Sequence, residues 1–351
     1  RSLAEGPGPT LLPACPLMHG TGGFTASECL SEGGQVALLT GRHFDPVELW
    51  DTVERQGVNA LVIVGDPFAR PMLSALDDRP DRWDLSSLVG IVSSGAMWSE
   101  GVKEGLLRHH PTMLLVDAFS SSEAVGMAAS VSTATTTAKT AEFVLGPDVL
   151  VLDGHGKPLA PGSDEVGVLA LGGRNPLGYY KDPRRSEETF RTIGNMRYAI
   201  PGDFARARDD GTIQLLGRGS SSINTAGEKV YPEEVEEVLK SHPAVRDAVV
   251  VGVPDEQYGE MVVAVVEPAG DDRPDEASLV DLVRSHLAGY KVPRRLRVVE
   301  TIGRAPNGKV DYARVRRETA GWAAGAGAGG GDDADLRLAD LGVADEAVAG
   351  S

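Results

Sequence analysis

Short apolar runs alternate with segments that carry helix signals in the first part of the chain. The runs cover residues 36–39, 61–64, 88–92 and 113–116. A short apolar run bounded by polar segments is typical of a buried strand of a parallel sheet. The alternation therefore predicts strand–helix–strand units, which place binding loops at the carboxyl ends of their strands.

One of the intervening helices carries signals at both ends. Asp45 can cap its amino terminus, Pro46 suits its first position, and Glu48 stands where the partner residue of a capping box would lie. Gly57 can end the helix in a left-handed conformation. We therefore expect a helix between Asp45 and Gly57.

The pattern changes near Phe143. Strand-like runs at 149–152 and 166–171 are separated from later segments by turn signals at 153–156 and 209–211, which predicts an antiparallel β subdomain. Beyond it we expect a smaller α+β unit that has helices at 233–240 and 279–287 and strands at 248–253 and 261–266.

These patterns predict three segments. Residues 1–217 form part of a large domain, residues 218–318 form a small domain, and residues 319–351 form a flexible tail rich in glycine, alanine and acidic residues. The tail is expected to be flexible because it cannot bury enough surface to offset its ordering entropy.

The composition describes a globular protein with a strong negative charge. With 351 residues, 41% of them hydrophobic, the chain can bury a sizeable core. Its 34 basic and 51 acidic residues leave a formal charge of -17, which argues against a nucleic-acid partner because the phosphate backbone is also negative. Cys15 and Cys29 are too few for a disulfide framework or a multi-cysteine zinc site, so a reducing cytoplasm is expected.

No apolar run reaches membrane-spanning length, so no transmembrane segment is predicted. The first residues contain no initiator methionine and lead into no signal-peptide core. We therefore expect the natural start to lie upstream.

The most informative motif follows the apolar run at 113–116 and reads Asp117-Ala118-Phe119-Ser120-Ser121-Ser122-Glu123. The ring of Phe119 can stack on a purine, Ser122 can donate a hydrogen bond to a phosphate oxygen, and Glu123 can hold Mg²⁺. An ordinary serine-rich loop explains the same residues, so this motif alone leaves both interpretations open.

Three charged residues further along stand at turns or strand ends. Asp203 can accept hydrogen bonds from ribose hydroxyls, Arg218 can contact a ribose or a phosphate, and Lys309 follows an Asn-Gly turn from which its ammonium can enter a cleft. Each of them is also typical of a solvated surface position. Their order after the serine-rich motif favours a nucleotide site.

Taken in this order, over about residues 16–317, the motifs resemble those of the adenylate-forming superfamily of acyl-CoA synthetases, luciferases and peptide-synthetase adenylation domains. Residues 119–123 are similar to the aromatic-Gly-x-Thr-Glu motif, with Ser120 in place of glycine and Ser122 in place of threonine. Residues 178–183 resemble the Gly-Tyr-x-x-x-Pro motif, and residues 201–203 resemble Thr-Gly-Asp.

The resemblance implies a catalytic and nucleotide-binding role for each matching residue. Lys309, from a motif similar to Pro-x-x-x-Gly-Lys, would offset charge as the carboxylate attacks the α-phosphorus, with Ser122 and the Mg²⁺ ligand Glu123. The implied nucleotide contacts are Ser94, Gly95 and Ala96, which are similar to the Gly-Ala-Pro adenine loop although Met97 and Trp98 depart from it, and then Asp117, Ala118, Phe119, Asp203 and Arg218.

Other matching residues concern the acyl group, the hinge and coenzyme A. His19 and Gly20 lie in a segment similar to Pro-Leu-x-His-x-x-Gly, whose histidine lines the acyl pocket, although a lone histidine is more often structural. Ser220 stands at the hinge, where the family usually has Asp or Lys. Gly227, Glu228 and Lys229 would meet the pantetheine arm of coenzyme A, while Gly227 also suits a turn and Pro232 a helix start. The apolar residues Met18, Phe24, Trp98 and Met127 can line the acyl pocket or, more commonly, belong to the general core.

The resemblance implies a partial large adenylate-forming domain, parallel α/β with an antiparallel β subdomain, followed by a smaller mobile α+β domain. It further implies an ATP-dependent acyl-CoA synthetase, an AMP-forming acid–thiol ligase that converts a hydrophobic carboxylic acid to acyl-AMP and passes the acyl group to coenzyme A. The implied cofactors and substrates are ATP, Mg²⁺ and coenzyme A, and a homodimer is an open option.

The family's Ser/Thr/Gly-rich triphosphate loop has no counterpart in this sequence. We therefore expect about the first third of such an enzyme to be missing, apolar faces to be exposed, and the chain alone to have weak or no ligase activity. Two alternatives stay open. One is an adenylation domain that loads a carrier protein, which the short glycine-rich tail disfavours, and the other is a non-catalytic fragment or interaction module.

Overall fold

The computed structural model describes residues 8–41, 43–270, 273–305 and 308–325. The chain divides into two compact units. Unit 1 comprises Arg1–Leu216 together with Arg304–Lys309, and unit 2 comprises Gly217–Gly303 together with Val310–Ser351. Lys309 therefore belongs to unit 1, although it follows most of unit 2 in the sequence.

Unit 1 begins with a parallel α/β layer. Its strands are β1 (Thr10–Pro13), β2 (Gln35–Val36), β3 (Ala60–Ile63), β4 (Gly90–Ser93) and β5 (Leu114–Phe119), and its helices are α1 (Gly20–Ser31), α2 (Pro46–Gln56), α3 (Asp66–Asp78) and α4 (Glu100–His109). The strands run in the order β2-β1-β3-β4-β5, and all these neighbours are parallel. The predicted parallel rhythm is confirmed. The run at 36–39 is the exception, because only its first residue pairs, as part of β2.

Helix α2 begins and ends as its sequence predicts, with one difference. Asp45 caps it through a 2.8 Å hydrogen bond from the Val47 amide, and Gly57 ends it in the left-handed conformation. Glu48, however, is not a capping-box partner, because its carboxylate accepts from the amide and hydroxyl of Thr40 at 2.7 and 2.6 Å. The carboxylate therefore holds the preceding loop instead of the helix end.

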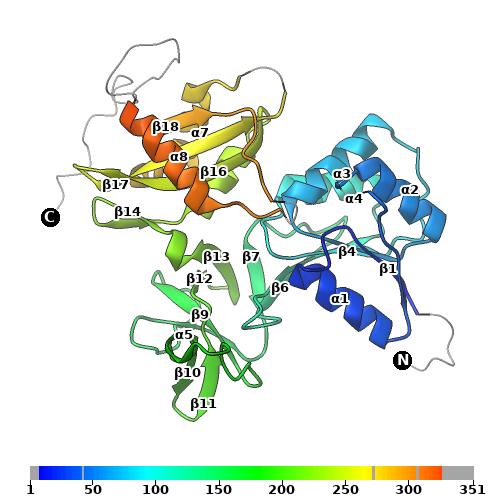
Figure 1. Ribbon diagram of the computed structural model, residues 1–351, viewed down its shortest axis with the longest axis horizontal. Helices are drawn as coiled ribbons and strands as arrows, with labels where there is room; N and C mark the ends of the chain where they lie inside the picture. Colours follow the sequence, from blue (N-terminus) through cyan, green and yellow to red (C-terminus); the bar gives the residue numbers. More distant parts are fainter. Residues whose placement is uncertain (1–7, 42, 271–272, 306–307, 326–351) are drawn as a thin grey trace. The chain divides into compact units, whose positions relative to one another are not determined.

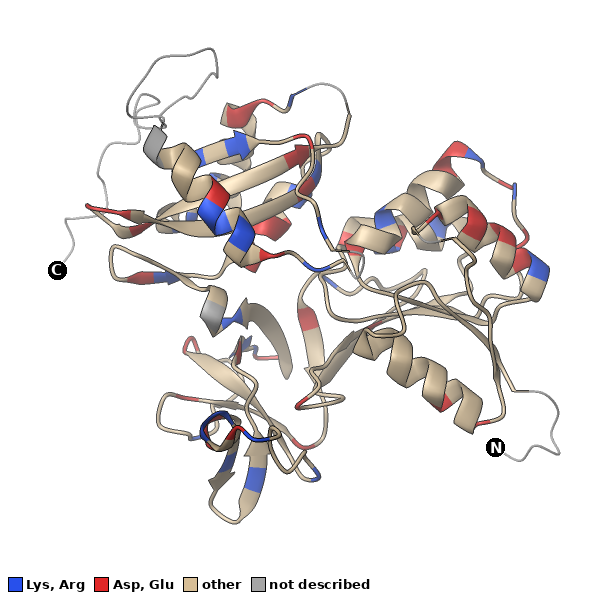
Figure 2. Ribbon diagram, viewed as in Figure 1, with Lys and Arg blue, Asp and Glu red and all other residues tan. Residues whose placement is uncertain are grey.

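The two faces of this sheet are covered unequally. Helix α1 lies on one face, and α2, α3 and α4 lie on the other (Figure 1). Figure 2 shows charged positions along α2 and α3, whereas α1 is nearly free of them. Beyond α1, large apolar side chains of one face of β5 and of the following strands stay exposed: Leu114 at 44%, Val131 at 51% and Val144 at 61%. The expected exposed apolar face is thus present.

The four apolar residues that were predicted to lie either in the wall of the acyl pocket or in the general core fall into two groups. Trp98 and Met127 are fully buried and belong to the core. Met18 is 89% exposed and Phe24 is 57% exposed, so for these two the expectation of a general core position is wrong. The buried residues of α1 are Gly22, Ala26 and Cys29, so its packed side leaves Phe24 outside.

The antiparallel part of unit 1 continues the same sheet from β5. It contains β6 (Ala128–Ser132), β7 (Glu142–Leu145), β8 (Val149–Leu152), β9 (Val166–Gly172), β10 (Phe190–Ile193), β11 (Met196–Ala199), β12 (Asp203–Ala207), the first five residues of β13 (Thr212–Arg218) and the short helix α5 (Pro183–Thr189). The last two residues of β13 belong to unit 2. The change from parallel to antiparallel pairing occurs between β5 and β6. The predicted antiparallel subdomain is confirmed, and it has its own apolar core around Phe143, Leu169 and Ile213.

Unit 2 is an α+β unit built on one sheet. Its elements are the 3-10 turns η2 (Gly219–Ser221) and η3 (Gly289–Lys291), the strands β14 (Ile223–Thr225), β15 (Glu228–Val230), β16 (Val245–Asp255), β17 (Gly259–Pro268) and β18 (Arg295–Val298), and the helices α6 (Pro232–Lys240), α7 (Glu276–His286) and α8 (Tyr312–Gly325). Alternate residues of β16 join two separate cores: Val250 packs with residues of α6 and α7, and Val251 packs with residues of α8. The predicted helices and strands of this unit are present.

The predicted tail begins too early. Residues 319–325 belong to α8, in which Thr319 is 1% exposed and Trp322 packs against the apolar cluster around Val251. The indole supplies the apolar surface that the glycine- and alanine-rich composition suggested was missing. The rest of the expected tail lies outside the described residues.

Candidate active site

The candidate site lies where the parallel strands of unit 1 end. The loop after β4 contains Ser94, Gly95 and Ala96, and His19 stands directly before α1. A Cβ added at Gly95 would lie 2.9 Å from the Cε1 atom of His19, so the imidazole rests against the glycine backbone. The hydroxyl of Thr21 also donates to the carbonyl of Ser94 at 3.3 Å. Two segments far apart in sequence, the predicted acyl-pocket histidine and the predicted adenine loop, are therefore in contact.

His19 has a structural role as well. Its Nδ1 atom accepts a 3.3 Å hydrogen bond from the Thr21 amide and so caps α1. Burial, and secondly the positive charge of Lys309, lower the pKa of His19 below its usual value. The ring is therefore neutral at physiological pH, as an Nδ1 acceptor must be. Gly20, its predicted companion, is the first residue of α1.

A buried polar network fixes the loop after β4. Asp66 is 5% exposed, and its carboxylate accepts from the amide and hydroxyl of Ser99 at 2.9 Å each and from Arg70 at 3.0 Å. The Asp66 amide donates to the carbonyl of Met97, and Ser93 accepts from the Gly65 amide. The loop is thus held from both ends, which keeps its backbone in one conformation over the sheet edge.

The segment that carries Lys309 belongs to unit 1. A Cβ on Gly308 would lie 3.4 Å from both Pro67 and Phe68, so this turn rests on the first turn of α3. The Gly308 amide and carbonyl are hydrogen-bonded to Ala305 and Arg304. The positive charge of Lys309 contributes to the lowered pKa of His19, so the ammonium lies near enough to the imidazole for their charges to interact.

The serine-rich loop after β5 folds onto itself. Ser120 accepts from the Gly126 amide at 2.8 Å, and Ser121 accepts from the Ala124 amide at 3.2 Å. Ser122 is exposed at the outside of this turn. The ring of Phe119 packs against Phe143 at 6.0 Å, so at least part of it belongs to the apolar core. Two serines are therefore structural, and Ser122 is presented to solvent.

Glu123, the predicted metal ligand, is held by a residue from another part of the chain. The hydroxyl of Tyr179 donates to its Oε1 atom at 2.7 Å. Burial, and secondly the carboxylate of Glu123, raise the pKa of Tyr179, so the phenol stays protonated and acts as the donor.

The donor set of this loop fits a nucleotide-bound Mg²⁺. In the described ranges no group of three or more His, Cys, Asp or Glu side chains could hold a metal ion. Mg²⁺ commonly binds through one or two carboxylates together with substrate phosphates, and it does not need a cage made only of protein. A single half-buried carboxylate at Glu123 is therefore the expected protein contribution.

The remaining predicted site residues fall in both units. Asp117 is buried in β5 beside Ser93 of β4, Ala118 is half-buried, and Asp203 is the buried first residue of β12, all within unit 1. Arg218 ends β13, and the backbone of Ser220 lies in η2; both belong to unit 2.

The predicted coenzyme A residues occupy a hairpin of unit 2. Thr225 pairs with Glu228, so Ala226 and Gly227 form a two-residue turn, and their φ angles are +50° and +86°. Positive φ at both positions is the property of a type I′ turn. The turn interpretation of Gly227 and the helix start at Pro232 are confirmed, and Glu228 and Lys229 are exposed beside the turn.

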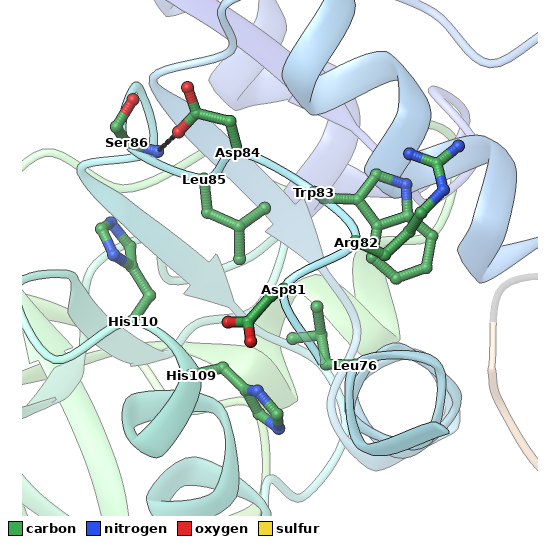
Figure 3. A pocket seen from close by; sticks show the side chains of 9 residues that line it. All are labelled: Leu76, Asp81, Arg82, Trp83, Asp84, Leu85, Ser86, His109 and His110. Atoms are coloured by element: carbon green, nitrogen blue, oxygen red, sulfur yellow. Dashed lines mark hydrogen bonds between the residues drawn. The ribbon is translucent and has the colours of Figure 1, made fainter. Parts of the chain in front are cut away.

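A separate cavity of about 270 Å³ lies at the amino ends of the parallel strands, between the carboxyl ends of α3 and α4. Figure 3 shows His109 and His110 in its lining. His109 contacts Asp77 at 2.7 Å, and His110 contacts the carbonyl of Leu88 at 2.8 Å. These histidines brace the helix ends, and the cavity is no part of the candidate site.

Sequence reasoning missed Asp66, Ser99 and Tyr179. An aspartate three residues after the buried strand β3 was a visible signal for Asp66, because strand carboxyl ends carry binding loops. Tyr179 lay inside a motif that resembled the family's, but no role followed from its residues alone. Its contact with Glu123 spans 56 positions of sequence.

Comparisons with known proteins identify the family. Residues 2–180 match the model of the AMP-binding enzyme family, and residues 234–309 match that of the AMP-binding enzyme C-terminal domain. The chain belongs to the AMP-binding enzyme family, the adenylate-forming enzymes that its motifs resemble.

Individual relatives span more than this chain. It is 44% identical over 321 residues to a medium/long-chain-fatty-acid–CoA/3-oxocholest-4-en-26-oate–CoA ligase of Mycobacterium marinum. The aligned region covers 91% of this chain and 58% of that protein. It is 42% identical over 324 residues to a 3-oxocholest-4-en-26-oate–CoA ligase of Rhodococcus rhodochrous, again with 58% of that protein covered. The chain thus spans less than two thirds of these relatives.

A solved structure supports the fold. The amide bond synthetase McbA of Marinactinospora thermotolerans matches with a TM-score of 0.73 and 31% identity, over 90% of this chain and 62% of that one. The mixed parallel and antiparallel fold predicted from the sequence is therefore that of an adenylate-forming enzyme.

No described helix combines the length and the apolar character that a membrane crossing requires.

Proposed function

We propose that the protein carrying this chain is an ATP-dependent acyl-CoA synthetase, which converts a hydrophobic carboxylic acid to acyl-AMP and passes the acyl group to coenzyme A. The observation that carries the proposal is the convergence within unit 1. The loop at Gly95 contacts His19, and Lys309 is held close enough to act on the same imidazole.

The chemistry follows from charge. Attack of a carboxylate on the α-phosphorus of ATP brings two anions together, and the ammonium of Lys309 offsets the charge that develops. Mg²⁺, held by Glu123 and the phosphates, would supply Lewis-acid stabilisation of the departing pyrophosphate. Ser122 is exposed and available to a phosphate oxygen, and Asp203 and Arg218 are proposed for the ribose.

The two cysteines of this chain, Cys15 and Cys29, are buried. Burial raises the pKa of Cys15 to about 11, and burial also raises that of Cys29. Both thiols are therefore protonated at neutral pH and poor nucleophiles. Neither thiol is therefore proposed as the acceptor. We propose coenzyme A as the acceptor and the exposed hairpin residues Gly227, Glu228 and Lys229 as its contacts.

The names of the relatives suggest the acid. Two of them are CoA ligases for a steroid carboxylate, and one of these also for medium- and long-chain fatty acids. We extend this to the present chain as a hydrophobic, bulky or long-chain acid, which fits an acyl site beside an uncharged histidine.

The test is ATP–pyrophosphate exchange with the complete gene product and a panel of fatty and steroid acids. We expect exchange with some of these acids, a loss of at least about a hundredfold in Lys309→Ala, and no change in Lys157→Ala, a matched control at an exposed turn lysine. Exchange that is equal in Lys309→Ala and in the unchanged protein would refute the assigned role.

The acceptor is tested separately. Acyl-CoA formation by the loaded enzyme supports the proposal. Formation of amide bonds and of no thioester would overturn the CoA part of the proposal while leaving adenylation in place; McbA is named as an amide bond synthetase.

A further inference from the structure

The Gly178-Tyr179 motif has no role in the proposed chemistry, yet its tyrosine touches the candidate site. The hydroxyl of Tyr179 lies 2.7 Å from Oε1 of Glu123 and donates to it. The two residues come from different parts of unit 1, the segment after β9 and the loop after β5. This hydrogen bond therefore ties the antiparallel subdomain to the serine-rich loop.

The backbone of Tyr179 is held in place by hydrogen bonds at the start of α5. The Tyr179 amide donates to the hydroxyl of Ser186 at 2.8 Å, and that hydroxyl donates to the carbonyl of Asp182 at 2.6 Å. Asp182 caps α5 by accepting from the Arg185 amide at 3.0 Å. The start of α5 thus fixes the backbone of Tyr179.

The ring is also enclosed on its faces. Phe190 lies 5.7 Å from it, centroid to centroid, and the guanidinium of Arg185 lies 4.4 Å over the ring. A ring with fixed backbone and packed faces presents its hydroxyl at one place. The residue next to it, Tyr180, is 87% exposed and has none of this packing against the core.

A carboxylate on a loop has several rotamers, and a metal that binds one of them must select it at a cost in side-chain entropy. A hydrogen bond from Tyr179 to Oε1 restricts that choice before the metal arrives. Partners of this kind, which orient a metal ligand from behind, typically change metal affinity by tenfold or more when removed.

We propose that Tyr179 is a positioning residue that presents the Glu123 carboxylate to the Mg²⁺ of bound ATP. The inference rests on the proposed function, because it needs a nucleotide-bound metal at Glu123. It gives the Gly-Tyr-x-x-x-Pro segment of this chain a physical task, which is to anchor the metal ligand from the antiparallel subdomain.

The experiment measures Mn²⁺·ATP binding by electron paramagnetic resonance, with Mn²⁺ as the probe for Mg²⁺, and AMP binding by calorimetry as the metal-free reference. Both are applied to the complete gene product, to Tyr179→Phe and to the matched control Tyr180→Phe. We expect Tyr179→Phe to weaken the metal-dependent binding about tenfold and to leave AMP binding unchanged. Tyr180→Phe should change neither.

A double-mutant cycle separates positioning from general packing. In a Glu123→Gln background, Tyr179→Phe should cause no further loss, because the carboxylate that it orients is gone. A loss that persists in that background, or an equal loss of AMP binding, would show that Tyr179 is only structural and would overturn the inference.

The remaining outcomes also decide. Unchanged Mn²⁺·ATP binding in Tyr179→Phe overturns the positioning role and leaves the proposed function standing. Absence of both AMP and Mn²⁺·ATP binding in the unchanged protein overturns the proposed function, and the inference with it.

Discussion

The contact between Gly95 and His19 gives a sharp prediction for Gly95→Ala. Gly95 has a φ of +96°, which side chains other than glycine rarely adopt, and the new Cβ would lie 2.9 Å from Cε1 and 3.1 Å from Nε2 of His19. The backbone strain alone costs on the order of 1–3 kcal/mol. If the imidazole turns away to relieve the clash, α1 also loses its cap, which costs about 1 kcal/mol more. We expect a total destabilisation of about 3 kcal/mol.

The assay is urea unfolding followed by tryptophan fluorescence in a Trp322→Phe background. The remaining tryptophans, Trp50, Trp83 and Trp98, all belong to unit 1, so the signal reports that unit alone. Gly101→Ala is the matched control: Gly101 lies in α4, and its Cβ would meet nothing within 4 Å. It should stabilise the unit by about 0.5 kcal/mol.

Equal stability of Gly95→Ala and the unchanged chain would refute the reasoning. It would mean that the loop after β4 does not hold the observed backbone, or that the ring of His19 is not seated on it. Proton NMR of the His19 ring distinguishes these, since only a displaced ring changes its chemical shift in the variant.

Other predictions concern charge and packing. The pKa of His19 is lowered in the folded state, so the contribution of the neutral ring to stability is complete above about pH 6.5 and is lost as the pH falls through the folded-state pKa. Lys309→Ala should raise the pKa of His19, which NMR titration measures. Asp66→Ala strips Ser99 and Arg70 of their buried acceptor and should destabilise unit 1 by about 3 kcal/mol in urea, whereas Asp77→Ala, at an exposed ion pair, should cost under about 1 kcal/mol. Removing the last turns of α8, with Trp322, should destabilise unit 2 by about 3 kcal/mol, seen as a lower midpoint of thermal unfolding by circular dichroism. No change on that truncation would mean that the indole does not belong to the core.

The sequence by itself determined the elements whose signals are local. The helix between Asp45 and Gly57 was predicted from its cap, its proline and its terminal glycine, because these act within a few residues. The valine-rich strands of unit 2 were also predicted, because a short apolar run such as 248–253, rich in β-branched residues, is typical of a buried strand. Composition excluded a disulfide framework in the same direct manner. The order of the motifs was enough to predict the family.

The tertiary structure decided which distant residues meet. Nothing local to Tyr179 indicates that its hydroxyl reaches Glu123, and nothing local to Gly95 indicates a histidine against its backbone. Glu48 shows the reverse case, in which a correct local signal lost to a competing partner, because Thr40 offers two donors to one carboxylate. Trp322 packs against the apolar cluster around Val251, and the residues that were predicted to begin a flexible tail are part of α8. The local sequence shows which polar and apolar groups need a partner. The tertiary fold determines which partner each group meets, because the energy of a contact depends on which surfaces the topology brings within reach.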